Sequence, residues 1–150
     1  TDQFVIAGSE AAMQAVLEKA REKGATKTDR LAVAVPSHCP LLGQAAQKLF
    51  EAIRKVPFKR PAIAYLSGST GRVLWQPERI ADDLALARPL YWANAMTAAY
   101  ERGVRLAVEM PPGSVLTGLA KRVMTEGDAV SIQQEGFNTV LRLGQRKRTG

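Results

Sequence analysis

The sequence predicts an α/β fold in which helices alternate with the strands of a parallel sheet. Runs of helical periodicity alternate with short apolar runs along all 150 residues. Residues 31–35 (LAVAV) lack polar alternation, which is typical of a strand covered on both faces. Glycine and proline residues separate the runs, as they do in layered α/β proteins.

The first part of the chain predicts a strand, a helix and a second strand. Residues 3–7 (QFVIA) form a short apolar run that Gly8 ends, and Ser9 is a suitable N-cap for a helix that Gly24 terminates. The apolar face of that helix consists of Ala12, Met13, Val16, Leu17 and Ala20. The second strand spans residues 31–35.

The middle of the chain predicts a helix, a strand and a short helix. A wide apolar stripe follows Pro40, and Pro57 lies just beyond its end. The stripe consists of Leu41, Leu42, Ala45, Ala46, Leu49, Phe50 and Ile53. Residues 62–66 predict a strand that ends in the turn-forming SGSTG. Pro77 begins a helix that we expect to reach about Ala87.

The last part of the chain predicts three helices and two strands. In order, they are a helix over 92–102, a strand over 104–110, a helix over 114–124, a strand over 128–132 and a helix over 136–143. The PPG loop leads from a strand directly into the helix that Ser114 caps. The N-terminus of that helix is a candidate site for an anion or a carbonyl oxygen, and a plain connecting loop is the alternative.

Composition limits the class of protein. The chain is long enough for one domain with a core, is 46% apolar, and has no run of about 20 apolar residues that could span a bilayer. Its single cysteine cannot form an internal disulfide, so we expect a cytoplasmic protein. Because the chain starts at Thr1, directly before a predicted strand, we expect it to be part of a longer protein.

The net charge of +7 favours anionic partners. Part of it lies in the tail RLGQRKRTG, which can also be read as a solvated tail. Only Phe137 lies near this tail, whereas nucleic-acid binders of the stacking type place aromatic residues among the basic ones. We therefore expect no nucleic-acid partner.

His38 and Cys39 are the only histidine and the only cysteine. Two residues cannot supply the three or four ligands that zinc takes, so we expect no metal site. Adjacent side chains usually diverge, which disfavours a Cys–His dyad and favours Cys39 as a small apolar residue of the core.

His38 is also a candidate general base. It follows an apolar run, where open α/β sheets place their sites, and Pro36 and Pro40 bracket it. The chain contains no G-x-S-x-G that would supply a serine nucleophile. Spacing alone therefore leaves two roles open, and a structural histidine is the better supported of the two.

Four segments resemble one known family. VPSHCPLL resembles the V-P-S-H-C/S-x-L-M motif of malonyl-CoA:acyl-carrier-protein transacylases, and VEMPPGSVLTGLAKRV resembles their E-x-G-P-G-x-V-L-T-G-L segment. RPLYWANAM resembles their P-V-x-W stretch, with Pro89 and Trp92 in register, and QFVIAG resembles their Q-x-V-I-x-G strand. The segments keep the family's order and cover nearly the whole chain.

This resemblance implies the C-terminal half of an acyltransferase fold. Residues 1–36 would form part of a ferredoxin-like small subdomain, and residues 37–150 the C-terminal part of a hydrolase-like large subdomain with a parallel sheet. The family's G-H-S-x-G serine, malonate-binding arginine and oxyanion glutamine have no counterparts here. The resemblance therefore implies that the chain alone is inactive and that its partner is an N-terminal half carrying G-x-S-x-G.

The resemblance also implies the chemistry. Malonyl-CoA would acylate the serine, and the acyl group would pass to the phosphopantetheine-type thiol of an acyl carrier protein, with His38 as general base and acid. Ser37 and Val115 would contact the substrate, and the backbone carbonyl of Ala85 would orient His38. The CoA thioester is a substrate in this scheme, so no tightly bound cofactor, nucleic acid or membrane is expected.

One departure from the family pattern refines the expectation. EMPPG replaces the usual E-V-G-P-G, which is similar to the malonyltransferase subunit of biotin-independent malonate decarboxylase. We therefore favour that subunit over the transacylase of fatty-acid synthesis, which is the alternative. A non-catalytic module that binds CoA or a carrier protein is a second alternative.

Overall fold

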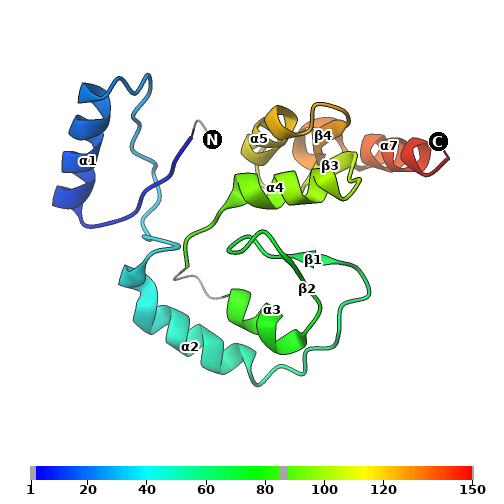
Figure 1. Cartoon of the computed structure of the whole chain (residues 1–150), viewed down its shortest axis with the longest axis horizontal. Coiled ribbons are helices and arrows are strands. Elements are labelled where there is room, and N and C mark those ends of the chain that lie inside the picture. The colour runs from blue at the N-terminus through cyan, green and yellow to red at the C-terminus, as the bar shows by residue number, and fades with distance from the viewer. Residues whose placement is uncertain (1–2, 85–87, 150) are drawn as a thin grey trace. The chain divides into compact units, whose positions relative to one another are not determined.

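The structure is a computed structural model that describes residues 3–84 and 88–149, and it divides into two compact units (Figure 1). Unit 1 comprises Thr1–Tyr65 and Leu74–Leu90, and unit 2 comprises Leu66–Val73 and Tyr91–Gly150. This division does not test the expected subdomain boundary after residue 36, which stays a prediction.

Unit 1 begins with α1 (Glu10–Glu22), as the sequence predicts. The hydroxyl of Ser9 accepts a hydrogen bond from the Ala12 N–H at 3.4 Å. The helix ends before Gly24, whose φ of 87° lies in the left-handed region that glycine adopts without strain. No side chain of α1 is buried, so local capping rather than packing defines this helix.

The strand predictions for residues 3–7 and 31–35 are wrong for this chain. Neither segment is a strand, and no backbone hydrogen bond joins either to a neighbouring strand within 3–84 and 88–149. A strand requires a neighbour whose backbone completes its hydrogen bonds. The apolar side chains stay exposed as a result, with Phe4 80% and Val33 65% accessible.

The predicted helix after Pro40 has two parts. A 3₁₀ turn (Pro40–Leu42) precedes α2 (Gly43–Ile53), so the first turn is tighter than an α-helix. The next helix, α3 (Pro77–Asp83), starts at its predicted proline, and its predicted end near Ala87 lies outside the described residues. The buried side chains of the two helices are Ala46, Ile80 and Ala81.

The SGSTG turn joins two short strands. β1 (Tyr65–Leu66) pairs with β2 (Val73–Leu74), so the predicted strand over 62–66 is shorter than expected and β2 is a strand that the sequence pattern missed. Ser67 is fully buried, and its hydroxyl accepts a hydrogen bond from the Thr70 N–H at 3.0 Å.

Unit 2 contains the second sheet and the remaining helices of the described chain. Its elements are α4 (Trp92–Glu101), β3 (Leu106–Glu109), α5 (Val115–Val123), β4 (Asp128–Ser131), α6 (Ile132–Glu135) and α7 (Phe137–Thr149). β3 and β4 are parallel, which confirms the predicted strand direction, and Glu109 is in register with Ser131. The pattern missed α6, and α7 extends beyond the predicted end at residue 143.

The core of unit 2 forms between its helices and the parallel pair. Ala120, Met124 and Ala129 are buried, and the side chains packed against them are Trp92, Met96, Tyr100 and Ala107. Among the residues that the structure describes, no helix is long and apolar enough to cross a membrane.

Candidate functional site

The turn that carries His38 is tight and locally bonded. The Ser37 N–H donates to the Val35 carbonyl at 2.8 Å, and the Cys39 thiol donates to the Pro36 carbonyl at 3.1 Å. Because the thiol uses the Pro36 carbonyl, the structure supports a structural role for Cys39 rather than a dyad with its neighbour.

The backbone of His38 has an uncommon conformation. Its φ is 62°, in the left-handed region that residues with a Cβ rarely adopt. Every other residue with a positive φ in the described chain is a glycine. Such conformations cost about 1–3 kcal/mol each and are concentrated at functional sites. The turn therefore places the imidazole by a conformation that the sequence does not favour locally.

The imidazole of His38 has an unused polar atom. Its Nδ1 is buried and has no hydrogen-bond partner among residues 3–84 and 88–149. A buried ring nitrogen of this kind is costly unless it is bonded. The expected partner, the backbone carbonyl of Ala85, lies outside the described residues.

The second candidate element is the connection between β3 and α5 in unit 2. The carboxylate of Glu109 accepts hydrogen bonds from the Leu116 N–H at 3.1 Å, the Thr117 N–H at 2.6 Å and the Thr117 hydroxyl at 2.6 Å. Desolvation acts to raise the pKa of Glu109, but these hydrogen bonds outweigh it and hold the pKa below its ordinary value. Glu109 is therefore a carboxylate that caps α5.

The Glu109 cap occupies the position at the N-terminus of α5 where the sequence predicted a candidate anion site. Two of the N–H groups that would face an anion already bind the protein's own carboxylate. The structure thus favours the plain-connection alternative for these groups. The sequence analysis missed Glu109, although an acidic residue at the end of a strand, eight residues before the Thr117 donor, was a usable signal.

Residues from β4 and α6 hold the loop that leads into α5. The Ser131 hydroxyl, fully buried, donates to the Gly113 carbonyl at 2.7 Å. The Gly113 N–H donates to the Gln133 side chain, and the Gln134 amide donates to the Ser114 hydroxyl at 2.9 Å. Hydrogen bonds therefore tie the loop to both β4 and α6.

The predicted site residues fall in different parts of the chain. Ser37 is half-buried and shares the turn with His38 in unit 1. Val115 is the first residue of α5 in unit 2, and 68% of it is exposed. Ser37 and His38 are therefore close because they are adjacent in the sequence. Val115 is exposed to solvent directly after the loop that joins β3 to α5.

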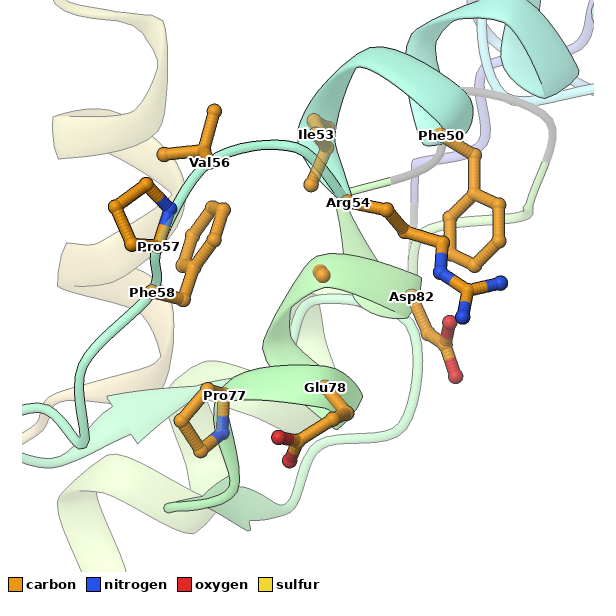
Figure 2. Close-up of a pocket in the computed structure, with 10 residues that line it drawn as sticks. Phe50, Ile53, Arg54, Val56, Pro57, Phe58, Pro77, Glu78 and Asp82 are labelled. Carbon is orange, nitrogen blue, oxygen red and sulfur yellow. The ribbon is translucent and has the colours of Figure 1, made fainter.

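A cleft of about 540 Å³ lies between α2, the segment that follows it, and α3 (Figure 2). Its lining is mainly apolar and includes Phe50, Ile53, Val56 and Phe58. Figure 2 shows Arg54 from the end of α2 near Asp82 of α3, with Glu78 one turn away on the same helix. His38 does not line this cleft, so the cleft is separate from the candidate chemistry.

No group of three or more His, Cys, Asp and Glu side chains in the described part of the chain could hold a metal ion.

Comparison with known proteins identifies the chain's relatives. No protein-family model matches the sequence. Over 92% of its length, the chain is 33% identical to the malonyl CoA-acyl carrier protein transacylase of Haemophilus influenzae, and it spans 45% of that protein. Over 81% of its length, it is 33% identical to the transacylase of Escherichia coli K12, and it spans 40% of that one. The chain thus spans less than half the length of these relatives.

Solved structures agree with these relatives. The transacylase of Xanthomonas oryzae superposes with a TM-score of 0.77 at 34% identity, over 83% of this chain and 40% of that one. A malonyl-transacylase in complex with its type II PKS acyl-carrier protein gives 0.77 at 31% identity, over 83% of this chain and 41% of that one. The chain therefore has the α/β fold of the corresponding part of these acyltransferases, and its relatives in sequence and in structure are malonyl-CoA:acyl carrier protein transacylases.

Proposed function

We propose that this chain is part of a malonyl-CoA:acyl carrier protein transacylase and supplies its general base. The observation that carries the proposal is His38, which has a left-handed backbone and a buried Nδ1 without a partner in the described chain. The proposed acyl donor and acceptor come from the names of the relatives, which specify malonyl-CoA and an acyl carrier protein.

The two ring nitrogens of His38 take different roles in this proposal. Because Nδ1 is buried, it is the nitrogen that donates its proton to a protein carbonyl, for which we propose Ala85. Nε2 is then the basic nitrogen that exchanges protons with the substrate. Ser37 and Val115 contact the acyl group, as the resemblance implies.

The reaction proceeds in two half-reactions. A serine hydroxyl attacks the malonyl thioester carbonyl while Nε2 of His38 takes its proton, and the tetrahedral intermediate expels the CoA sulfur, which receives that proton. The thiol of the carrier protein then attacks the malonyl-serine ester, gives its proton to Nε2, and the proton returns to the serine oxygen. His38 is neutral before and after each half-reaction.

The serine comes from outside this sequence. The chain contains no G-x-S-x-G, and it spans 40–45% of the curated relatives that it matches. We propose that a polypeptide segment equivalent to the rest of those relatives carries the serine, and that this chain alone does not transfer malonyl groups. Within the complete enzyme, residues 1–36 would belong to a ferredoxin-like subdomain and residues 37–150 to the large subdomain.

The transacylase alternative is better supported than the malonate decarboxylase subunit. Both curated relatives and the superposed structures carry the transacylase or malonyl-transacylase name. Only the EMPPG segment favoured the decarboxylase subunit, and it is a single local departure from the family pattern.

Reconstitution with the missing part tests the proposal. The chain is coexpressed with a transacylase segment that carries G-H-S-x-G, and intact mass spectrometry follows acylation of that segment by malonyl-CoA and by acetyl-CoA. We expect malonyl loading to exceed acetyl loading, and loading to require both polypeptides. Equal loading would contradict the malonyl assignment, and CoA binding without any loading would favour the non-catalytic module.

A further inference from the structure

Helix α5 begins without the capping hydrogen bond that its sequence predicts. Ser114 occupies the N-cap position, but its side chain accepts no hydrogen bond from an N–H of the first turn. Its hydroxyl instead accepts a hydrogen bond from the Gln134 amide of α6 at 2.9 Å. The prediction that Ser114 caps this helix is therefore wrong, and the N–H groups of the first turn require another acceptor.

A carboxylate at the end of the preceding strand is that acceptor. One oxygen of Glu109 accepts from the Leu116 N–H at 3.1 Å, and the other accepts from both the N–H and the hydroxyl of Thr117 at 2.6 Å. Hydrogen bonds to an ionised acceptor are about twice as strong as those between neutral groups. Thr117 is buried, so this part of the contact is shielded from water. Glu109 therefore ties the first turn of α5 to the end of β3.

Val115 lies between two anchored segments of backbone. Before it, the Gly113 carbonyl accepts a hydrogen bond from the Ser131 hydroxyl at 2.7 Å. After it, the next two residues carry the N–H groups that Glu109 holds. The Val115 side chain is 68% exposed within this chain, so packing against the described residues contributes little to its position. The hydrogen bonds on its two sides therefore determine where Val115 lies.

We propose that Glu109 is a positioning residue for the acyl group of malonyl-CoA and that it acts through Val115. The inference rests on the proposed function, in which Val115 contacts that group. Both carboxylate oxygens of Glu109 are bound by α5, so Glu109 holds the helix and transfers no proton. A substrate contact that is misplaced by about 1 Å can cost about 10²-fold in rate, which is why such an anchor matters.

A purely structural cap is the alternative role for Glu109. In that role Glu109 stabilises α5, and its loss reduces the amount of folded enzyme without changing how that enzyme binds malonyl-CoA. The two roles predict different kinetics. Loss of a contact that the bound substrate already makes raises the half-saturating concentration of malonyl-CoA and leaves the maximal rate unchanged.

Kinetics of the reconstituted enzyme separate the two roles. Glu109→Gln keeps the size of the side chain but removes its charge and replaces one acceptor by a donor. Intact mass spectrometry follows single-turnover acylation of the serine over a range of malonyl-CoA concentrations. We expect the half-saturating concentration to rise about fivefold and the maximal rate to stay within about twofold of the wild type. Glu101→Gln, at the exposed end of α4, is the control and should change neither quantity.

A double-mutant cycle tests whether Glu109 acts through Val115. Val115→Ala shortens the side chain that contacts the acyl group, and we expect the half-saturating concentration to rise about tenfold. Independent effects would multiply to about fiftyfold in the double variant. If Glu109 acts through Val115, the double variant should instead stay near the tenfold rise of Val115→Ala alone.

Thr117 provides a second pair of variants that keep the charge of Glu109. Thr117→Val removes one of the three hydrogen bonds to the carboxylate, and we expect a rise of about threefold. Thr117→Ser keeps the hydroxyl and should restore the wild-type value. Hydrogen exchange measured on the chain alone gives a readout without activity, because the Leu116 and Thr117 amides should exchange faster in Glu109→Gln.

Each other outcome overturns the inference. If Glu109→Gln leaves the half-saturating concentration unchanged, lowers only the maximal rate, or multiplies with Val115→Ala, then Glu109 does not act through Val115. Unchanged exchange of the two amides would show that the carboxylate does not hold the first turn. In all these cases the wild-type enzyme still loads malonyl groups and the proposed function survives. If the wild-type enzyme loads none, the proposed function fails, and this inference fails with it.

Discussion

The turn at residues 36–39 and the loop at residues 110–114 use their polar groups in opposite ways. In the first, the backbone of His38 is strained and a buried ring nitrogen lacks a partner in the described chain. In the second, Gly113 and Ser114 bind Ser131, Gln133 and Gln134. Within the described residues, the first connection leaves one buried ring nitrogen unbonded, whereas the second is held by several hydrogen bonds.

This difference separates a reactive group from its support. In the proposed mechanism Nε2 of His38 exchanges protons with the substrate, while a protein carbonyl holds Nδ1 and so orients the ring. A loop that positions a side chain must resist movement, and many fixed hydrogen bonds achieve this. The comparison is therefore consistent with the proposed general base at His38 and with a supporting role for the loop before α5.

The largest expected effect is at His38. In the reconstituted enzyme, His38→Gly should slow malonylation of the serine by about 10²- to 10⁴-fold, the usual contribution of general-base catalysis. Glycine accepts the left-handed φ of 62° without strain, so this variant should be at least as stable as the wild type. Single-turnover mass spectrometry and thermal melting of the same samples measure both quantities.

His38→Ala is the matched variant. It also removes the imidazole, but its Cβ keeps the strain of the left-handed backbone, so it should be as inactive as His38→Gly and less stable. A His38→Gly enzyme that acylates at the wild-type rate would show that His38 is structural. The turn at residues 36–39 would then have no catalytic role to set against the supporting role of the loop at residues 110–114.

The sequence predicted this part of the site only through family resemblance. Spacing around His38 left a structural histidine as the better supported role, because one histidine with no serine motif has no visible partner. The left-handed backbone could not be predicted, since the Pro36 and Pro40 pattern fixes neighbouring φ angles but not that of His38. Glu109 was missed because its partners, Leu116 and Thr117, depend on how α5 meets β3.

The second effect is an acid-dependent loss of stability through Glu109. The pKa of Glu109 is lower in the folded protein than its ordinary value of 4.5, so the ionised carboxylate stabilises the fold. That stability is present above about pH 4.5 and is lost as the pH falls through the lowered pKa. Urea midpoints measured from pH 7 to pH 3 should therefore decrease more in the wild type than in Glu109→Gln.

Glu101→Gln provides the control for this experiment. Glu101 is exposed at the end of α4, so its substitution should leave the pH dependence as in the wild type. If Glu109→Gln keeps the full acid dependence, the cap of α5 does not contribute to it. Another ionisable group would then have to account for the loss of stability in acid.

A smaller effect is expected at Ser131. Ser131→Ala removes the hydrogen bond from a fully buried hydroxyl to the carbonyl of the half-buried Gly113. The free energy of unfolding should fall by about 1 kcal/mol. Chemical denaturation measures this loss, and Ser114→Ala, which removes only the exposed contact to Gln134, should cost less. Equal losses would mean that burial does not distinguish the two contacts.

The fold was predictable where local signals and packing agree. The parallel pair β3–β4 and the helices α4 and α5 match their predicted ranges to within about two residues, because their apolar faces meet in one core. The segments 3–7 and 31–35 have the same apolar character but no neighbouring strand in the described chain. Composition reports the tendency to form a strand, and only a partner completes it.

The smallest effect concerns a committed contact in unit 1, the unit that contains His38. The Tyr65 hydroxyl donates to the Asp83 carboxylate at 3.0 Å, and burial, followed by this hydrogen bond and the negative charge of Asp83, raises the pKa of Tyr65 to about 12. The neutral phenol therefore adds stability that is complete below about pH 10 and lost as the pH rises towards 12. Ultraviolet absorbance of tyrosinate should show a component near pH 12 that Tyr65→Phe removes and Asp83→Asn shifts to lower pH. If Tyr65→Phe leaves that component in place, the component does not belong to Tyr65, and the raised pKa would not report the contact between Tyr65 and Asp83.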